Sequence, residues 1–120
     1  MLFCSMERLR LNDLILGYRK KMGNQWFYSP DMYAWSGTEI PFEQKDRSSG
    51  FRDKNRRLLF VHDLVLDAEL GILEIVQDEI TGMILMIELN QGNIVPEFSI
   101  RKKVMENSLQ WVSCSFLQSL

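Results

Sequence analysis

The stretch that decides the fold is Ser48-Ser49-Gly50-Phe51-Arg52-Asp53-Lys54-Asn55-Arg56-Arg57-Leu58-Leu59-Phe60-Val61-His62-Asp63-Leu64-Val65. Its first half is charged and contains three turn-forming residues, Gly50, Asp53 and Asn55. Its second half, from Leu58 to Val65, is apolar except for two polar residues near its end. A change of chemistry this abrupt predicts a surface loop that leads into a buried β-strand.

Length and composition predict a single folded domain, residues 1–120. A chain of 120 residues is long enough to bury a core of its own. Its 46% hydrophobic and 25% charged residues are the proportions of ordinary globular proteins. The formal net charge of -2 gives no overall attraction to nucleic acid or to anionic membranes. Binding of either would therefore require a local patch of positive charge.

The sequence shows no targeting signal. It begins without the basic and apolar regions of a signal peptide, and no apolar run approaches the roughly 20 residues needed to span a bilayer. The two cysteines, Cys4 and Cys114, lie near opposite ends, which leaves both a disulfide and two free thiols open, with free thiols favoured. We therefore expect a cytoplasmic protein that does not bind membranes.

The first third of the chain predicts a β-hairpin. Leu9 alternates with Arg8 and Arg10, which is the period of a half-buried strand whose arginines face solvent. Gly23 and the asparagine after it provide a tight turn before the aromatic run 25–29. The following residues 38–50 contain a proline and show no periodicity, which predicts a long loop.

Five aromatic residues gather in this first third: Trp26, Phe27, Tyr28, Tyr33 and Trp35. They could form a platform on which bases or sugars stack. The favoured interpretation is that they fill the core of a small β domain, because each ring buries a large apolar area.

The remainder of the chain predicts further strands. Residues 71–76 and 83–89 are apolar runs separated by a turn, although a helix over 70–89 is the rival interpretation. Residues 83–89 are apolar on both faces, which predicts a central position in a sheet. A further strand is expected over 98–104, and 105–120 is compatible with either a short helix or a final strand. Together these patterns predict an all-β or mostly β fold that closes as a small barrel with long loops. A short C-terminal helix is left as an open alternative.

No catalytic or metal-binding constellation is evident. His62 is the single histidine, and its neighbour Asp63 would lie on the opposite face of a strand, so the two cannot form a catalytic dyad. A zinc site needs three or four clustered ligands, and no glycine-rich phosphate loop is present. We expect no enzymatic activity, no metal and no cofactor.

Positive charge is concentrated in residues 45–57. The basic residues there are Lys45, Arg47, Arg52, Lys54, Arg56 and Arg57, against the two acids Asp46 and Asp53. Such a run can contact nucleic-acid phosphates. An ordinary solvated loop is the favoured interpretation, because charge runs usually serve solubility.

The opening stretch resembles the signature of the YopX-like family of small phage and prophage proteins, which typically reads Thr-Gly-Leu-Lys-Asp-Lys-Asn-Gly-Lys-Glu-Ile-Tyr-Glu-Gly-Asp-Ile-Val. The residues that agree outright are Gly50, Asp53, Lys54, Asn55, Asp63 and Val65. Arg56 stands where the family has a turn glycine, and the resemblance extends over about residues 15–90. It implies an SH3-like β-barrel and a phage or prophage origin, and no activity.

In this framework Gly50, Asp53 and Asn55 are structural turn residues, and Asp63 caps the turn at the start of the following strand through its side-chain oxygen. The leading hypothesis is therefore a non-catalytic accessory protein that binds another protein or a second copy of itself. The alternative is a nucleic-acid-binding protein that uses the basic loop 45–57.

Overall fold

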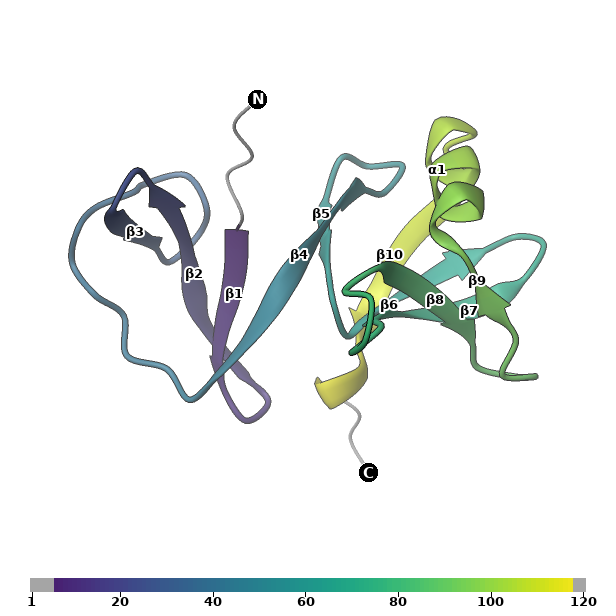
Figure 1. Cartoon of the computed structure of the whole chain (residues 1–120), viewed down its shortest axis with the longest axis horizontal. Helices are drawn as coiled ribbons and strands as arrows, with labels where there is room; N and C mark the ends of the chain where they lie inside the picture. Colours follow the sequence, from purple (N-terminus) through teal and green to yellow (C-terminus); the bar gives the residue numbers. More distant parts are fainter. Residues whose placement is uncertain (1–5, 118–120) are drawn as a thin grey trace. The chain divides into compact units, whose positions relative to one another are not determined.

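The computed structural model describes residues 6–117, which form two compact units, one up to Ser48 and one from Ser49 onward. Within these residues the chain is mostly β, with two antiparallel sheets and one α-helix (Figure 1). This confirms the predicted fold class at the level of all-β or mostly β. No helix in this part of the chain has the length and apolarity needed to cross a membrane.

The first unit is an antiparallel sheet in the order β3-β2-β1-β4. Its strands are β1 (Met6–Leu11), β2 (Leu14–Met22), β3 (Gln25–Ser29) and the first half of β4 (Gln44–Arg52). The predicted hairpin is confirmed, because β2 pairs with β3 across a turn at Gly23, whose φ of 64° suits glycine. β4 then carries the chain into the second unit, where it neighbours β5.

Two expectations for the first unit are wrong, and one carboxylate explains both. Arg8 is only 2% exposed rather than facing solvent, and strand β4 occupies much of the predicted loop 38–50. The Nε atoms of Arg8 and Arg10 both lie 2.9 Å from Oδ2 of Asp46 on β4. Because the inward position of β4 holds a neutralised acid rather than an apolar residue, its alternation could not be recognised by hydrophobicity.

The second unit contains a five-stranded sheet in the order β10-β6-β7-β8-β9, together with β5 and α1. Its elements are β5 (Leu58–Phe60), β6 (Asp63–Asp67), β7 (Gly71–Gln77), β8 (Ile84–Glu88), β9 (Ile94–Val95), α1 (Glu97–Met105), β10 (Leu109–Cys114) and a 3₁₀ turn, η1 (Ser115–Leu117). The predicted central position of residues 83–89 is confirmed, because β8 lies between β7 and β9. The rival helix over 70–89 does not form.

The second unit has a continuous apolar core. It consists of Phe51, Leu59, Val61, Val65, Leu73, Ile75, Ile84, Met86, Val95, Ile100 and Leu109. None of the five aromatic residues of the first third belongs to this cluster. Of those five, Tyr28 is buried whereas Tyr33 is 89% exposed, so the core interpretation holds for Tyr28 alone.

The predicted continuous strand from Leu58 to Val65 is in fact two strands, β5 and β6. The break occurs at His62, whose φ of 80° is incompatible with an extended strand. Two hydrogen bonds hold the break: the His62 amide donates to the carbonyl of Ile75 at 2.8 Å, and the Phe60 amide donates to Oδ2 of Asp63 at 2.8 Å. Apolar composition alone could not reveal a turn made by side-chain hydrogen bonding.

The strand expected over residues 98–104 is helix α1. Its buried Ile100 and half-buried Val104 are four residues apart, as one helix face requires, whereas Phe98 is 76% exposed. The alternation of Phe98 and Ile100 was therefore misleading. The open choice for 105–120 is resolved as strand β10 followed by η1, and residues 118–120 lie outside the described part of the chain.

Candidate functional site

The six basic residues of the 45–57 segment do not act as one loop. Lys45 and Arg47 lie on β4 in the first unit, and Lys45 pairs with Glu7 at 3.4 Å. The other four, Arg52, Lys54, Arg56 and Arg57, belong to the second unit, at and beyond the end of β4. We call residues 52–57 the basic turn. The prediction of a basic loop over 45–57 is thus corrected to a strand followed by a short turn.

Asp53 builds the basic turn with its side chain. Its Oδ1 accepts hydrogen bonds from the amides of Asn55 and Arg57, both at 2.9 Å. Its Oδ2 accepts a hydrogen bond from the amide of Trp111 on β10, also at 2.9 Å. Asp53 is 7% exposed, so the acid of the turn is buried against backbone donors rather than presented to solvent. The turn therefore offers positive charge to solvent and little negative charge.

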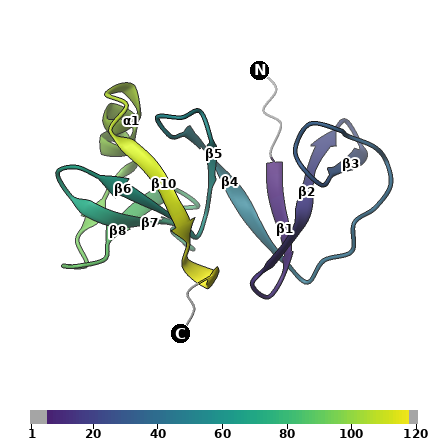
Figure 2. The same cartoon turned by 180° about the vertical axis from the view of Figure 1, so that it is seen from behind.

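The basic turn is fixed to the start of β10. The Lys54 amide donates to the carbonyl of Leu109 at 2.8 Å, next to the Asp53–Trp111 hydrogen bond. Figures 1 and 2 show the hairpin tip between β4 and β5 beside the start of β10 from both sides. Two backbone groups at the edge of β10 are thereby satisfied by the turn, which restricts its motion.

The four cations of the basic turn have no acidic partner in the described part of the chain. Arg52 donates from Nη1 to the carbonyl of Arg56 at 2.9 Å. The guanidinium carbon of Arg57 lies 3.4 Å from the ring centroid of Trp111. None of the four forms an ion pair with a carboxylate of residues 6–117. The turn is therefore an uncompensated positive patch beside an aromatic ring.

The backbone of the basic turn includes an uncommon conformation. Arg56 has a φ of 68°, in the left-handed region that glycine favours. The turn thus keeps the geometry that glycine would allow, and adds a fourth cation at its tip.

The remaining predicted turn residues lie outside the basic turn. Gly50 lies within β4, where its φ of 80° requires the freedom of glycine. Asp63 begins β6, and besides the Phe60 amide it accepts a hydrogen bond from the thiol of Cys114, with Sγ 3.3 Å from Oδ1. Its side chain therefore caps the turn that precedes it, and not the following one as predicted. The thiol of Cys114 is buried, and Cys4, the other cysteine of the predicted choice between a disulfide and two free thiols, lies outside the described residues.

The surroundings of His62 show no catalytic arrangement. Its Nδ1 lies 3.4 Å from Oε2 of Glu74, while both oxygens of the adjacent Asp63 accept hydrogen bonds from other groups. The described residues contain no cluster of three or more histidine, cysteine, aspartate or glutamate side chains able to hold a metal ion. The histidine is thus paired with one surface acid.

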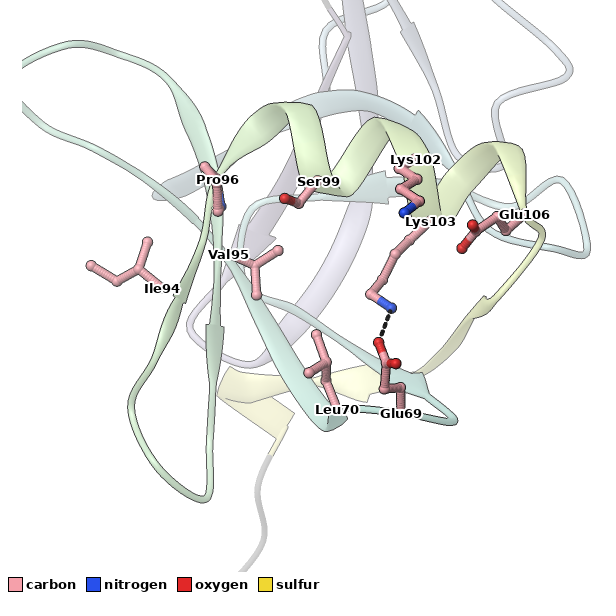
Figure 3. A pocket seen from close by; sticks show the side chains of 9 residues that line it. All are labelled: Glu69, Leu70, Ile94, Val95, Pro96, Ser99, Lys102, Lys103 and Glu106. Carbon is pink, nitrogen blue, oxygen red and sulfur yellow. Dashed lines mark hydrogen bonds and ion pairs between the residues drawn. The ribbon is translucent and has the colours of Figure 1, made fainter.

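A pocket of about 420 Å³ lies between α1, β9 and the turn before β7 (Figure 3). It is lined by Glu69, Leu70, Ile94, Val95, Pro96, Ser99, Lys102, Lys103 and Glu106. Lys103 reaches across from α1, with Nζ 3.1 Å from Oδ2 of Asp67 and 3.2 Å from Oε1 of Glu69. The lining holds two lysines and two glutamates, so the pocket selects neither sign of charge.

Burial and hydrogen bonding oppose each other at this ion pair. Burial alone would raise the pKa of Asp67, but donors from the amides of Leu70 and Glu69 and from Lys103 and Ser108 together lower it. Burial would likewise lower the pKa of Lys103, but its bonds to the two carboxylates raise it. The pair is therefore charged at neutral pH and clamps α1 to the turn that follows β6.

Two of the five aromatic residues predicted as a stacking platform, Trp26 and Trp35, contact the chain's own cations. The guanidinium carbon of Arg19 lies 3.9 Å from the Trp26 ring centroid and 4.7 Å from that of Phe42. Its Nε also lies 2.8 Å from Oε1 of Glu7. The Nζ atom of Lys20 lies 4.3 Å from the Trp35 ring centroid. Both tryptophans of the predicted platform thus already take part in internal cation–π contacts.

Sequence reasoning missed Trp111 as a site residue. Its signal was the alternation of Leu109 and Trp111 around a polar residue, but apolar spacings of three and four in the same segment obscured it. No protein-family model, no curated protein and no solved structure matches this chain.

Proposed function

We propose that this protein is a non-catalytic binding module and that its basic turn binds nucleic acid. The observation that carries the proposal is the set of four cations without an acidic partner, held by Asp53 on a fixed turn. Sequence alone favoured a protein partner. The order is reversed here because four exposed cations lie on one turn that is hydrogen-bonded to β10, and none of them pairs with a carboxylate of residues 6–117.

The salt dependence of binding tests the proposal. A labelled single-stranded oligonucleotide should bind the protein with an affinity that falls steeply with salt. In the variant R52A/K54A/R56A, the slope of log affinity against log salt should fall by about 2, because three phosphate contacts are lost. The single variant K45A removes a cation of the first unit that pairs with Glu7 and lies outside the basic turn, so it should change little. Salt-insensitive or absent binding by the unaltered protein would refute the proposal.

A protein partner, or a second copy of this chain, is the second candidate. Three large apolar side chains are well exposed around α1 and the pocket: Ile94 at 62%, Phe98 at 76% and Met105 at 84%. Exposed apolar groups gathered in one region are typical of association surfaces. If the protein self-associates, F98S/M105S should lower its mass in light scattering, whereas I80S, at an exposed isoleucine between β7 and β8, should not.

The resemblance supports three further proposals. We propose a YopX-like relationship, a phage or prophage origin and an SH3-like barrel in the second unit. The barrel is supported by the hydrogen bonds from Asp53 and Lys54 to β10, which link the β4–β5 hairpin to the second sheet. Protected amides at Lys54 and Trp111 in hydrogen exchange would be expected of a barrel, and rapid exchange at both would argue against it.

We also propose that the protein lies in the cytoplasm and binds no membrane. The buried thiol of Cys114, which donates to Asp63, is in keeping with a reducing compartment. Fractionation of cells that express the tagged chain tests the location, and recovery with membranes would contradict it.

A further inference from the structure

We propose that the basic turn selects single-stranded nucleic acid, with one unpaired base stacking on the guanidinium of Arg57 above Trp111. This inference rests on the proposed nucleic-acid binding and names the form of the ligand. The proposal depends on which groups contact the indole ring of Trp111 and the guanidinium of Arg57.

Trp111 contacts both the apolar core and the basic turn. It packs against the core of the second unit, and the guanidinium carbon of Arg57 lies 3.4 Å from its ring centroid. The indole Nε1 is buried and has no hydrogen-bond partner among the described residues. Because its N–H group cannot reach solvent, the ring can contribute to recognition only through its face.

The guanidinium of Arg57 lies flat on the ring. A guanidinium is planar, and a separation of 3.4 Å between its carbon and the centroid leaves no room for an edge-on arrangement. Arg57 is exposed, and no further ring or carboxylate in the described part of the chain covers its outer face. A flat cationic surface is thus presented to solvent on a fixed aromatic support.

Arg19 provides an internal comparison. Its guanidinium carbon lies 3.9 Å from the ring centroid of Trp26 and 4.7 Å from that of Phe42, and its Nε pairs with Glu7, so it already has two aromatic contacts and an acidic partner. Arg57 has one ring and no acid. Arg57 therefore has one face of its guanidinium against Trp111 and no stacking partner among the described residues on the other face.

An unpaired base can stack on the outer face of the Arg57 guanidinium. Bases stack on arginine planes as well as on aromatic rings, and stacking is tolerant of sequence. In a duplex, neighbouring base pairs cover both faces of each internal base, so a duplex can bring only its phosphates. Three further exposed cations, Arg52, Lys54 and Arg56, belong to the same turn and can contact the phosphates that flank the base.

The test compares three labelled ligands of equal length by fluorescence anisotropy: oligothymidylate, an abasic deoxyribose-phosphate chain and a hairpin duplex. The unaltered protein should bind oligothymidylate about fivefold or more tightly than the abasic chain. R57K keeps the charge but lacks the planar group, so its affinities for these two chains should become equal while the salt slope is retained. K102A, which removes an exposed cation of α1, should preserve the preference.

The outcomes separate the two proposals. Salt-dependent binding with equal affinity for the thymidylate and abasic chains would refute the stack and leave nucleic-acid binding in place. Duplex binding as tight as single-strand binding would also refute it, as would an R57K variant that keeps the preference. Binding of none of the three would refute both. A near-ultraviolet circular dichroism spectrum of R57K that matches the unaltered protein excludes loss of folding as the cause.

Discussion

The carboxylate of Asp53 accepts a hydrogen bond from the backbone amide of Trp111, 58 residues further along the chain, at 2.9 Å. The same carboxylate closes its own turn through the amides of Asn55 and Arg57. One side chain therefore determines both the shape of the basic turn and its attachment to β10. The cations of the turn owe their fixed positions to an acid that solvent barely reaches.

Replacement of Asp53 should destabilise the second unit. D53A leaves three amides without their acceptor, so we expect a loss of about 2 kcal/mol or more in the free energy of unfolding. D53N keeps one acceptor oxygen and should lose less. Urea unfolding followed by tryptophan fluorescence measures both. D13A removes an exposed acid of the first unit and should change stability by less than about 0.5 kcal/mol. Equal stabilities for D53A and D13A would contradict the role given to Asp53.

The buried ion cluster of the first unit gives a second prediction. D46A removes the carboxylate that Arg8 and Arg10 share, and we expect it to cost about 3 to 5 kcal/mol, because a buried ion pair loses one of its members. Replacing all three residues by apolar ones of similar size, as in R8M/D46L/R10M, should be much less damaging. Thermal unfolding of the two variants checks the order. A triple variant less stable than D46A would show that the charges themselves are required.

Stability should fall at both extremes of pH through the pair of Asp67 and Lys103. The folded-state pKa of Asp67 lies below its ordinary value of 3.8, so its stabilisation is complete above about pH 5 and is lost as the pH falls through the lowered pKa. The pKa of Lys103 lies above 10.5, so its contribution is complete at neutral pH and is lost as the pH rises through the raised pKa.

Two variants separate the loss of stability at acidic pH from the loss at alkaline pH. D67N should flatten the acid limb of a plot of melting temperature against pH, and K103M should flatten the alkaline limb. Either variant will also lower stability at pH 7, because the partner loses its ion pair. An acid limb unchanged in D67N would show that other carboxylates cause it.

The left-handed conformation of Arg56 predicts a substitution that stabilises the protein. R56G should raise the free energy of unfolding by about 1 kcal/mol, because glycine adopts a φ of 68° without the strain of a side chain. R56A removes the same charge but keeps the strain, so it should not gain stability. Denaturant midpoints decide the matter, and equal midpoints for the two variants would mean that this backbone position carries no strain.

The sequence predicted the parts of the fold in which an aromatic or aliphatic run follows a glycine turn. The β2–β3 hairpin follows from its aromatic strand and the glycine turn, and the central position of β8 follows from apolar side chains on both faces. It failed where polar groups form the interior. Asp46 hid β4, and the side chain of Asp63 created a turn within an apolar run.

The candidate site was only half predictable. Lys54, Arg56 and Arg57 could be recognised as a local excess of charge, but the absence of acidic partners depends on Asp53 turning inward. Trp111 could not be assigned to the site at all, because its position beside Arg57 depends on strand pairing between distant segments. Properties set by contacts remote in sequence cannot be obtained from local patterns.

The dependence of the turn on β10 has a consequence for biosynthesis. The ribosome releases the arginine cluster more than 50 residues before it releases Trp111, and in that interval nothing supports the guanidinium of Arg57. A growing chain therefore carries the charges that attract RNA without the layered surface that would distinguish one form of nucleic acid from another. Selectivity arises only when translation has passed the strand that holds the indole.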